Sequence, residues 1–119
     1  MELKKYKPVI NDNKEYTLQE ASGGLYEELK MLMLKSAVTG TQEKFAIIKE
    51  FKLTKDFDKD ELKKFQESLS KEEISVKEFY EKVMSVIFTE KINGVTFDKI
   101  NLNQMSRAVS DFFLSASGT

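Results

Sequence analysis

Cysteine and histidine are both absent from the 119 residues of the chain, and tryptophan is missing as well. Without cysteine there is no disulfide framework and no thiolate nucleophile. Without histidine the usual zinc ligand sets cannot be assembled, and neither a Ser-His nor a Cys-His catalytic pair can form. These absences exclude the commonest metal centres and nucleophilic active sites, so we expect a protein that is not an enzyme and uses no cofactor.

Long apolar runs and an excess of one charge are missing too. No stretch approaches the roughly 20 apolar residues that a membrane-spanning helix needs, and residues 1–5 are not followed by the apolar run of a signal peptide. The 19 basic and 20 acidic side chains leave a net charge of −1, whereas a nucleic-acid binder normally carries a basic excess on one face. We expect a cytoplasmic protein whose partner is neither a membrane nor a nucleic acid.

With one proline and five glycines, the chain has no linker that would divide it. We therefore expect a single domain over residues 1–119, of a mainly α (α+β) class. Residues 3–18 are expected to form an extended hairpin, because Asn11-Asp12-Asn13 favours a tight turn between two short apolar segments. Residues 22–116 are expected to form a helical body of about five short helices in a small bundle.

Capping signals predict where several of these helices begin. Asp58, Ser75 and Asn101 are each followed three residues later by Glu or Gln, which is the pattern of a capping box. An earlier apolar helix is predicted to start after the glycines at 23–24 and to end at Gly40, and Thr41 is expected to cap the next one.

One acidic segment matches the spacing of a calcium-binding EF-hand loop at its first, third, fifth and twelfth positions. These positions are Asp56, Asp58, Asp60 and Glu67. The sixth position should be glycine and is Glu61, and the eighth should be apolar and is Lys63. Acidic residues also stabilise the start of a helix without any metal, so we expect no metal site here, and calcium remains an alternative.

Nine phenylalanines and five methionines are many for this length. Two predicted helices, around residues 25–38 and 76–88, are apolar over more surface than one small core should need, and exposed apolar surface usually marks a protein interface. Helical phase assigns one set to the core or to the edge of a groove: Leu29, Leu32, Met33, Phe79, Val83 and Phe112. It assigns a second set to a protein interface: Met31, Leu34, Met84 and Phe88.

The order of these elements resembles that of the small tail assembly chaperones of long-tailed bacteriophages and prophages. The resemblance is carried by the hairpin segment 7–18, the apolar helix after it, the segment 76–83 and the closing segment 102–113. It spans most of the chain and depends on the layout of elements, since the family has no catalytic signature.

The resemblance implies a chaperone that coats the tape measure protein, a long, helical and aggregation-prone protein, before tail tube subunits assemble around it. Such a chaperone self-associates along its client in the host cytoplasm and uses no cofactor or nucleotide. A client helix would lie in an apolar groove. The alternative is a small helical phage or bacterial regulator or inhibitor that binds a different protein.

Overall fold

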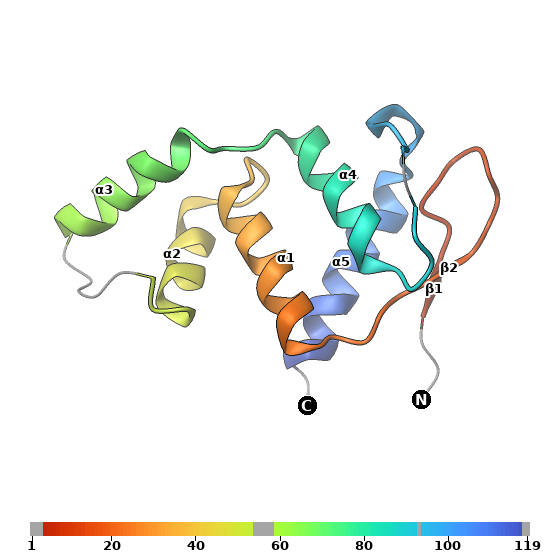
Figure 1. The fold of residues 1–119 in the computed structure, drawn as a ribbon, viewed down its shortest axis with the longest axis horizontal. Coiled ribbons are helices and arrows are strands. Elements are labelled where there is room, and N and C mark those ends of the chain that lie inside the picture. The colour runs from red at the N-terminus through yellow and green to blue at the C-terminus, as the bar shows by residue number, and fades with distance from the viewer. Residues whose placement is uncertain (1–3, 54–58, 93, 118–119) are drawn as a thin grey trace. The chain divides into compact units, whose positions relative to one another are not determined.

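The computed structural model describes residues 4–53, 59–92 and 94–117 (Figure 1). Within them the fold is mainly α, with five helices after a two-stranded hairpin, which confirms the predicted fold class. The elements in chain order are β1 (Lys5–Tyr6), β2 (Tyr16–Thr17), α1 (Gly23–Lys35), α2 (Thr41–Glu50), α3 (Lys59–Ser70), α4 (Val76–Ile87), the 3-10 turn η1 (Phe97–Lys99) and α5 (Leu102–Ser117).

Contacts within the chain define two compact units. The terminal unit comprises residues 1–27 and 80–119, and the central unit comprises residues 28–79. The single domain expected from the sequence stays a prediction.

In the terminal unit, backbone pairing extends beyond both strands of the N-terminal hairpin. An isolated two-stranded hairpin is marginally stable in water, and here further bridges join it to segments near residues 88 and 100. The antiparallel pairs are Lys5 with Thr17 and Tyr6 with Tyr16 in the hairpin, then Leu18 with Phe88 and Val9 with Ile100 outside it.

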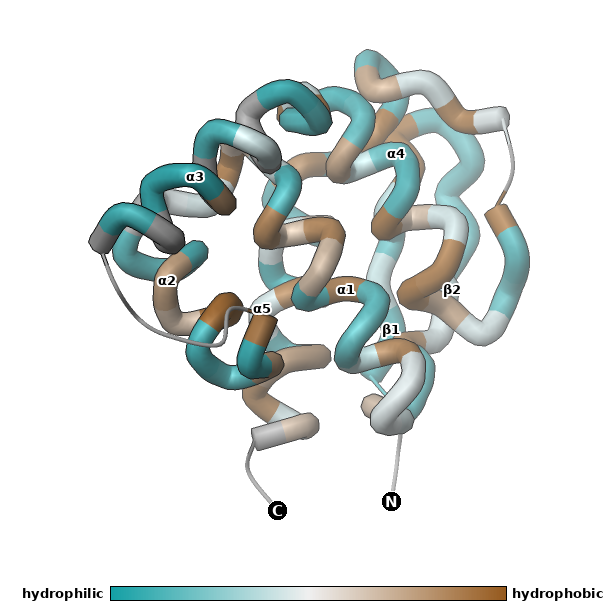
Figure 2. The backbone as a smooth tube through the Cα atoms, turned by 60° about the vertical axis from the view of Figure 1, so that its left-hand side comes forward, coloured by the Kyte–Doolittle hydropathy of each residue, from teal (hydrophilic) through white to brown (hydrophobic). Residues whose placement is uncertain are grey.

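Amphipathic helices supply the core of the terminal unit. In α5, Met105, Ala108 and Phe112 are fully buried at the spacing of one helix face. In α4, Val83 and Ile87 are buried one turn apart. Figure 2 shows hydrophobic and hydrophilic residues alternating along such helices. Burial of a large apolar side chain stabilises the fold by about 1.5–3 kcal/mol, so these faces hold the unit together.

The central unit is built around a second apolar cluster, formed by Leu34 of α1 with Ile47 and Ile48 of α2. Partly buried side chains pack against this cluster: Met31, Met33, Phe51, Leu53 and Phe65. Beyond α1 the backbone pairs in parallel with the segment before α4, as Ser36 bridges Ile74.

The predicted helix starts are confirmed at two positions. The side chain of Ser75 accepts a hydrogen bond from the Glu78 N–H (3.2 Å), and that of Asn101 accepts one from the Gln104 N–H (3.3 Å). The predicted cap at Asp58 lies outside the described residues.

Two predictions at the boundary of α1 and α2 are wrong. Helix α1 ends at Lys35 and not at Gly40, because the chain leaves the helix to form the bridge between Ser36 and Ile74. Thr41 is the first residue of α2 and does not cap it. Gly40 occupies the N-cap position with extended backbone and makes no side-chain bond.

Candidate partner-binding site

The interface assignment made from helical phase is wrong for three of its four residues. Leu34, Met84 and Phe88 are exposed by only 0%, 1% and 2%. Leu34 faces α2, and Phe88 follows α4 in an extended segment beside Leu18, so neither presents a free helix face. Met31 is partly exposed and packs against the core of the central unit. Helical phase identified apolar stripes, but it could not tell which stripe a later element covers.

The core assignment is mostly confirmed. Leu29, Phe79, Val83 and Phe112 are buried, with 3% exposure or less. Leu32 and Met33, the other two members of that set, are partly buried.

Six other large apolar side chains remain exposed, by 37–63%, in the described part of the chain. We call them the exposed apolar residues. Three lie in the central unit: Val38, Phe45 and Val76. Three lie in the terminal unit: Ile10, Leu102 and Leu114. This set could not be predicted from the sequence for two reasons. Val38 and Ile10 lie outside the helices. Phe45, Val76 and Leu102 each stand three positions before a buried residue of the same helix, a spacing that predicts burial.

Backbone pairing joins two segments of the central unit that each carry an exposed apolar residue. The N–H of Ala37 donates to the carbonyl of Ile74 (3.2 Å), beside the parallel bridge between Ser36 and Ile74. Val38 and Val76 each follow that bridge by two residues in the sequence.

In the terminal unit, backbone hydrogen bonds pair the segment that contains Ile10 with the segment that precedes Leu102. The N–H of Ile10 donates to the carbonyl of Lys99 (2.9 Å), and the N–H of Asn101 donates to the carbonyl of Pro8 (2.8 Å). Ile10 and Leu102 therefore lie near opposite ends of one short ladder, whose central bridge joins Val9 to Ile100.

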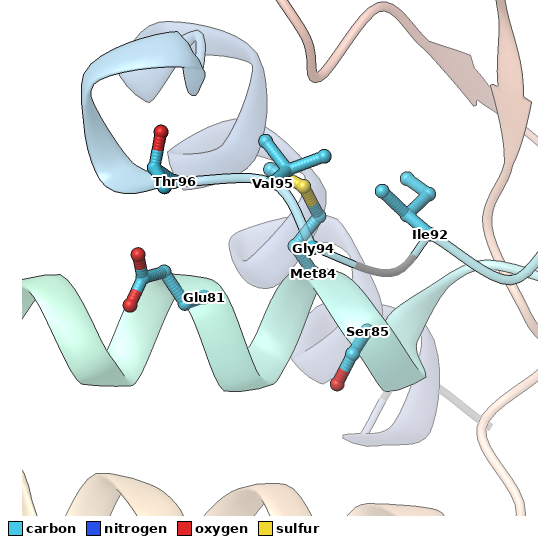
Figure 3. A pocket seen from close by; sticks show the side chains of 7 residues that line it. All are labelled: Glu81, Met84, Ser85, Ile92, Gly94, Val95 and Thr96. Atoms are coloured by element: carbon cyan, nitrogen blue, oxygen red, sulfur yellow. The ribbon is translucent and has the colours of Figure 1, made fainter.

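A pocket of about 310 Å³ lies in the terminal unit between α4 and the segment before η1. Helix α4 contributes Glu81, Met84 and Ser85, and the segment contributes Ile92, Gly94, Val95 and Thr96. In Figure 3 the carboxylate of Glu81 and the hydroxyl of Thr96 lie toward one end, whereas the side chains of Met84, Val95 and Ile92 lie toward the other. The lining is therefore acidic and hydroxylic at one end, and along the rest it combines apolar side chains with the hydroxyl of Ser85.

Hydrogen bonds fix the polar end of this pocket. One carboxylate oxygen of Glu81 (Oε2) accepts the backbone N–H of Phe97 at 3.0 Å. The hydroxyl of Thr96 donates to the carboxylate of Asp98. Gly94, which also lines the pocket, has a φ of +74°, a left-handed conformation that favours glycine.

A second polar cluster joins β1 to α5. The hydroxyl of Tyr6 donates to the Asp111 carboxylate, and the Lys4 ammonium lies 3.5 Å from the same group. The hydrogen bond from Tyr6 lowers the pKa of Asp111, with a smaller contribution from Lys4. Burial raises the pKa of Tyr6, and the bond to Asp111 adds to that rise. The cluster holds two elements together and contains no reactive pair.

Two further shifted groups also stabilise local structure. Glu90 accepts the backbone N–H (2.7 Å) and the hydroxyl (2.9 Å) of Thr17, and the backbone bond is the main cause of its lowered pKa. The hydroxyl of Tyr16 donates to Asp12 (2.8 Å), which raises the pKa of Tyr16 and closes the hairpin loop.

Two of the four candidate calcium ligands lie among the described residues. Asp60 and Glu67 are exposed on α3, whereas Asp56 and Asp58 lie outside the described residues. Across residues 4–53, 59–92 and 94–117, no three acidic side chains are grouped so that they could hold a metal ion.

Neither family models, nor curated proteins, nor solved structures gave a match to this chain. None of the helices in the described segments combines the length and the apolar character needed to cross a bilayer.

Proposed function

We propose that this chain is a non-catalytic chaperone that binds a helical client protein through its exposed apolar residues. The single observation that carries the proposal is the exposure of these six side chains in the described segments, where the other large apolar side chains are buried or half-buried. Apolar side chains left in water lose the stabilisation that burial provides, and a bound protein restores it.

The titratable groups also support a binding role. Shifted pKa values gather at catalytic sites when they serve chemistry. Here the shifted groups are Tyr6, Tyr16, Glu90 and Asp111, and each is held by a hydrogen bond that joins two segments of the terminal unit or closes its hairpin loop. Their shifts are explained by structure alone.

The client in this proposal is the tape measure protein of a long-tailed phage. The support is the resemblance of element order to the tail assembly chaperones, since the chain has an N-terminal hairpin, an apolar helix and a closing amphipathic helix in that order. Self-association along the client is part of the same proposal.

The test is co-expression with the tape measure protein encoded in the same genome. The wild-type chain should raise the fraction of that client that remains in the supernatant after centrifugation. A triple variant, Val38→Ser, Phe45→Ser and Val76→Ser, should lose most of this effect. The matched control changes three exposed polar residues of the same unit, Gln42→Ser, Lys49→Ser and Lys77→Ser.

The control variant should act as the wild type does. Circular dichroism and urea unfolding would show that both variants fold. If the wild type leaves the client insoluble, or if the polar control loses as much effect as the apolar variant, the proposal is contradicted.

A further inference from the structure

We propose that the pocket on α4 receives an arginine or lysine side chain of the bound protein, with its charged end on the carboxylate of Glu81. This inference depends on the proposed function only in that the side chain belongs to a protein partner.

The size of the pocket is sufficient for one long side chain. Its volume of about 310 Å³ is at the bottom of the range of about 300–1,000 Å³ that small-molecule sites occupy. One long side chain, with part of its neighbour, would fill most of such a space.

The polarity of the pocket fits an amphipathic side chain. Val95 supplies partly exposed apolar surface, the buried Met84 and Ile92 line the pocket from the core side, and Glu81 and Thr96 supply polar groups at one end (Figure 3). Arginine and lysine carry an apolar stem and a charged tip, and they commonly lay the stem along apolar surface.

The charge of the pocket selects a cation. Glu81 uses one carboxylate oxygen for the backbone N–H of Phe97, and no lysine or arginine of the described segments lies within 4 Å of it in an ion pair. A hydrogen bond between a cation and a carboxylate is about twice as strong as a neutral one, and arginine is a frequent anchor of protein interfaces.

The first test is a titration of the full chain with butylguanidinium, which has the stem and tip of arginine. Butylurea, a neutral molecule of nearly the same shape, is the reference probe. Methyl signals of Met84 and Val95 are followed by NMR. Butylguanidinium should shift both signals saturably, and butylurea should shift them much less. Equal responses to the two probes would overturn the inference, because charge would then play no part.

Two variants test whether butylguanidinium binds at Glu81. Glu81→Gln keeps the acceptor for Phe97 and removes the charge, so it should weaken butylguanidinium binding by about fivefold or more. Glu78→Gln, on the same helix but outside the pocket lining, should leave the titration unchanged. If Glu81→Gln binds as the wild type does, the pocket is not the cation site and the inference fails.

A second pair of variants tests whether a large side chain in the pocket blocks binding. Ser85 is exposed and lines the pocket, so Ser85→Phe should abolish the shifts, whereas Ser106→Phe on the exposed side of α5 should not. Persistent shifts in Ser85→Phe would overturn the inference.

The client assay separates this inference from the proposed function. If Glu81→Gln loses butylguanidinium binding yet keeps the client in solution as well as the wild type, the pocket takes no part in client binding. The inference then fails and the proposed function stands. If the wild type fails to solubilise the client, the proposed function fails, and the NMR titration still decides whether the pocket binds a guanidinium group.

Discussion

At the scale of single residues, polar side chains of the terminal unit form hydrogen bonds that join segments distant in the sequence. Tyr6 and Asp111 are 105 positions apart and share a hydrogen bond. This pair could not be predicted from the sequence, since no sequence pattern links a tyrosine near the N-terminus to an aspartate in the last helix. Only the fold brings them together.

The pair predicts a pH-dependent contribution to stability. Because the pKa of Asp111 is lower in the folded chain than in the unfolded one, its carboxylate stabilises the fold above the unfolded pKa of about 3.9. This contribution is lost as the pH falls through the folded pKa. Asp111→Asn should lower the free energy of unfolding by about 1–3 kcal/mol at pH 7, and the difference from wild type should shrink toward pH 3.

Urea unfolding at pH 7, 5 and 3 measures this effect, and Tyr6→Phe serves as the second variant because it removes the donor. A gap between wild type and Asp111→Asn that stays constant over this range would contradict the assignment.

Two glycines should respond to alanine with opposite signs. Gly94 has a φ of +74° and open space around its α-carbon, so Gly94→Ala should destabilise the chain by about 1 kcal/mol through backbone strain alone. Gly24 lies in α1 with open space around it, so Gly24→Ala should stabilise by about 0.5–1 kcal/mol. Thermal unfolding of both variants checks the prediction, and a loss of stability in Gly24→Ala would contradict it.

At the scale of elements, the sequence predicted the existence and order of the hairpin and the helices. Capping signals at Ser75 and Asn101 have local causes, so they could be read without the fold. The burial of each stripe has a non-local cause. Leu34 is buried because α2 packs on it, and Phe88 because Leu18 pairs beside it, and neither neighbour is visible in the local pattern.

Alanine substitution in α4 should separate core from surface. Met84→Ala removes a buried side chain and should cost about 2–5 kcal/mol. Val76→Ala changes an exposed one on the same helix and should alter stability by no more than about 0.5 kcal/mol. Urea unfolding curves give both values. Similar costs for the two variants would mean that Met84 is not in the core.

At the scale of the whole molecule, the candidate site differs from the one that sequence predicted. The prediction of a protein-binding surface stays a prediction, but the residues proposed to form it have changed from Met31, Leu34, Met84 and Phe88 to the exposed apolar residues. The pocket could not be predicted from the sequence either, because its lining combines α4 with the segment before η1, and only the fold brings the two together.

Self-association is expected at this scale. If the exposed apolar residues also contact a second copy, the mass measured by light scattering after size exclusion should rise with protein concentration. The triple variant with serine at positions 38, 45 and 76 should show a smaller rise. A wild-type mass that stays at 13.7 kDa at every concentration would contradict self-association.

The most direct measurement is photo-crosslinking during co-expression with the tape measure protein. A benzoylphenylalanine at position 45 replaces an exposed apolar residue of α2, and one at position 43 lies about 200° away on the same helix. We predict a crosslinked product with the client from position 45 and little or none from position 43. Equal yields from the two positions, or no product from position 45, would contradict the claim that exposed apolar residues bind the client.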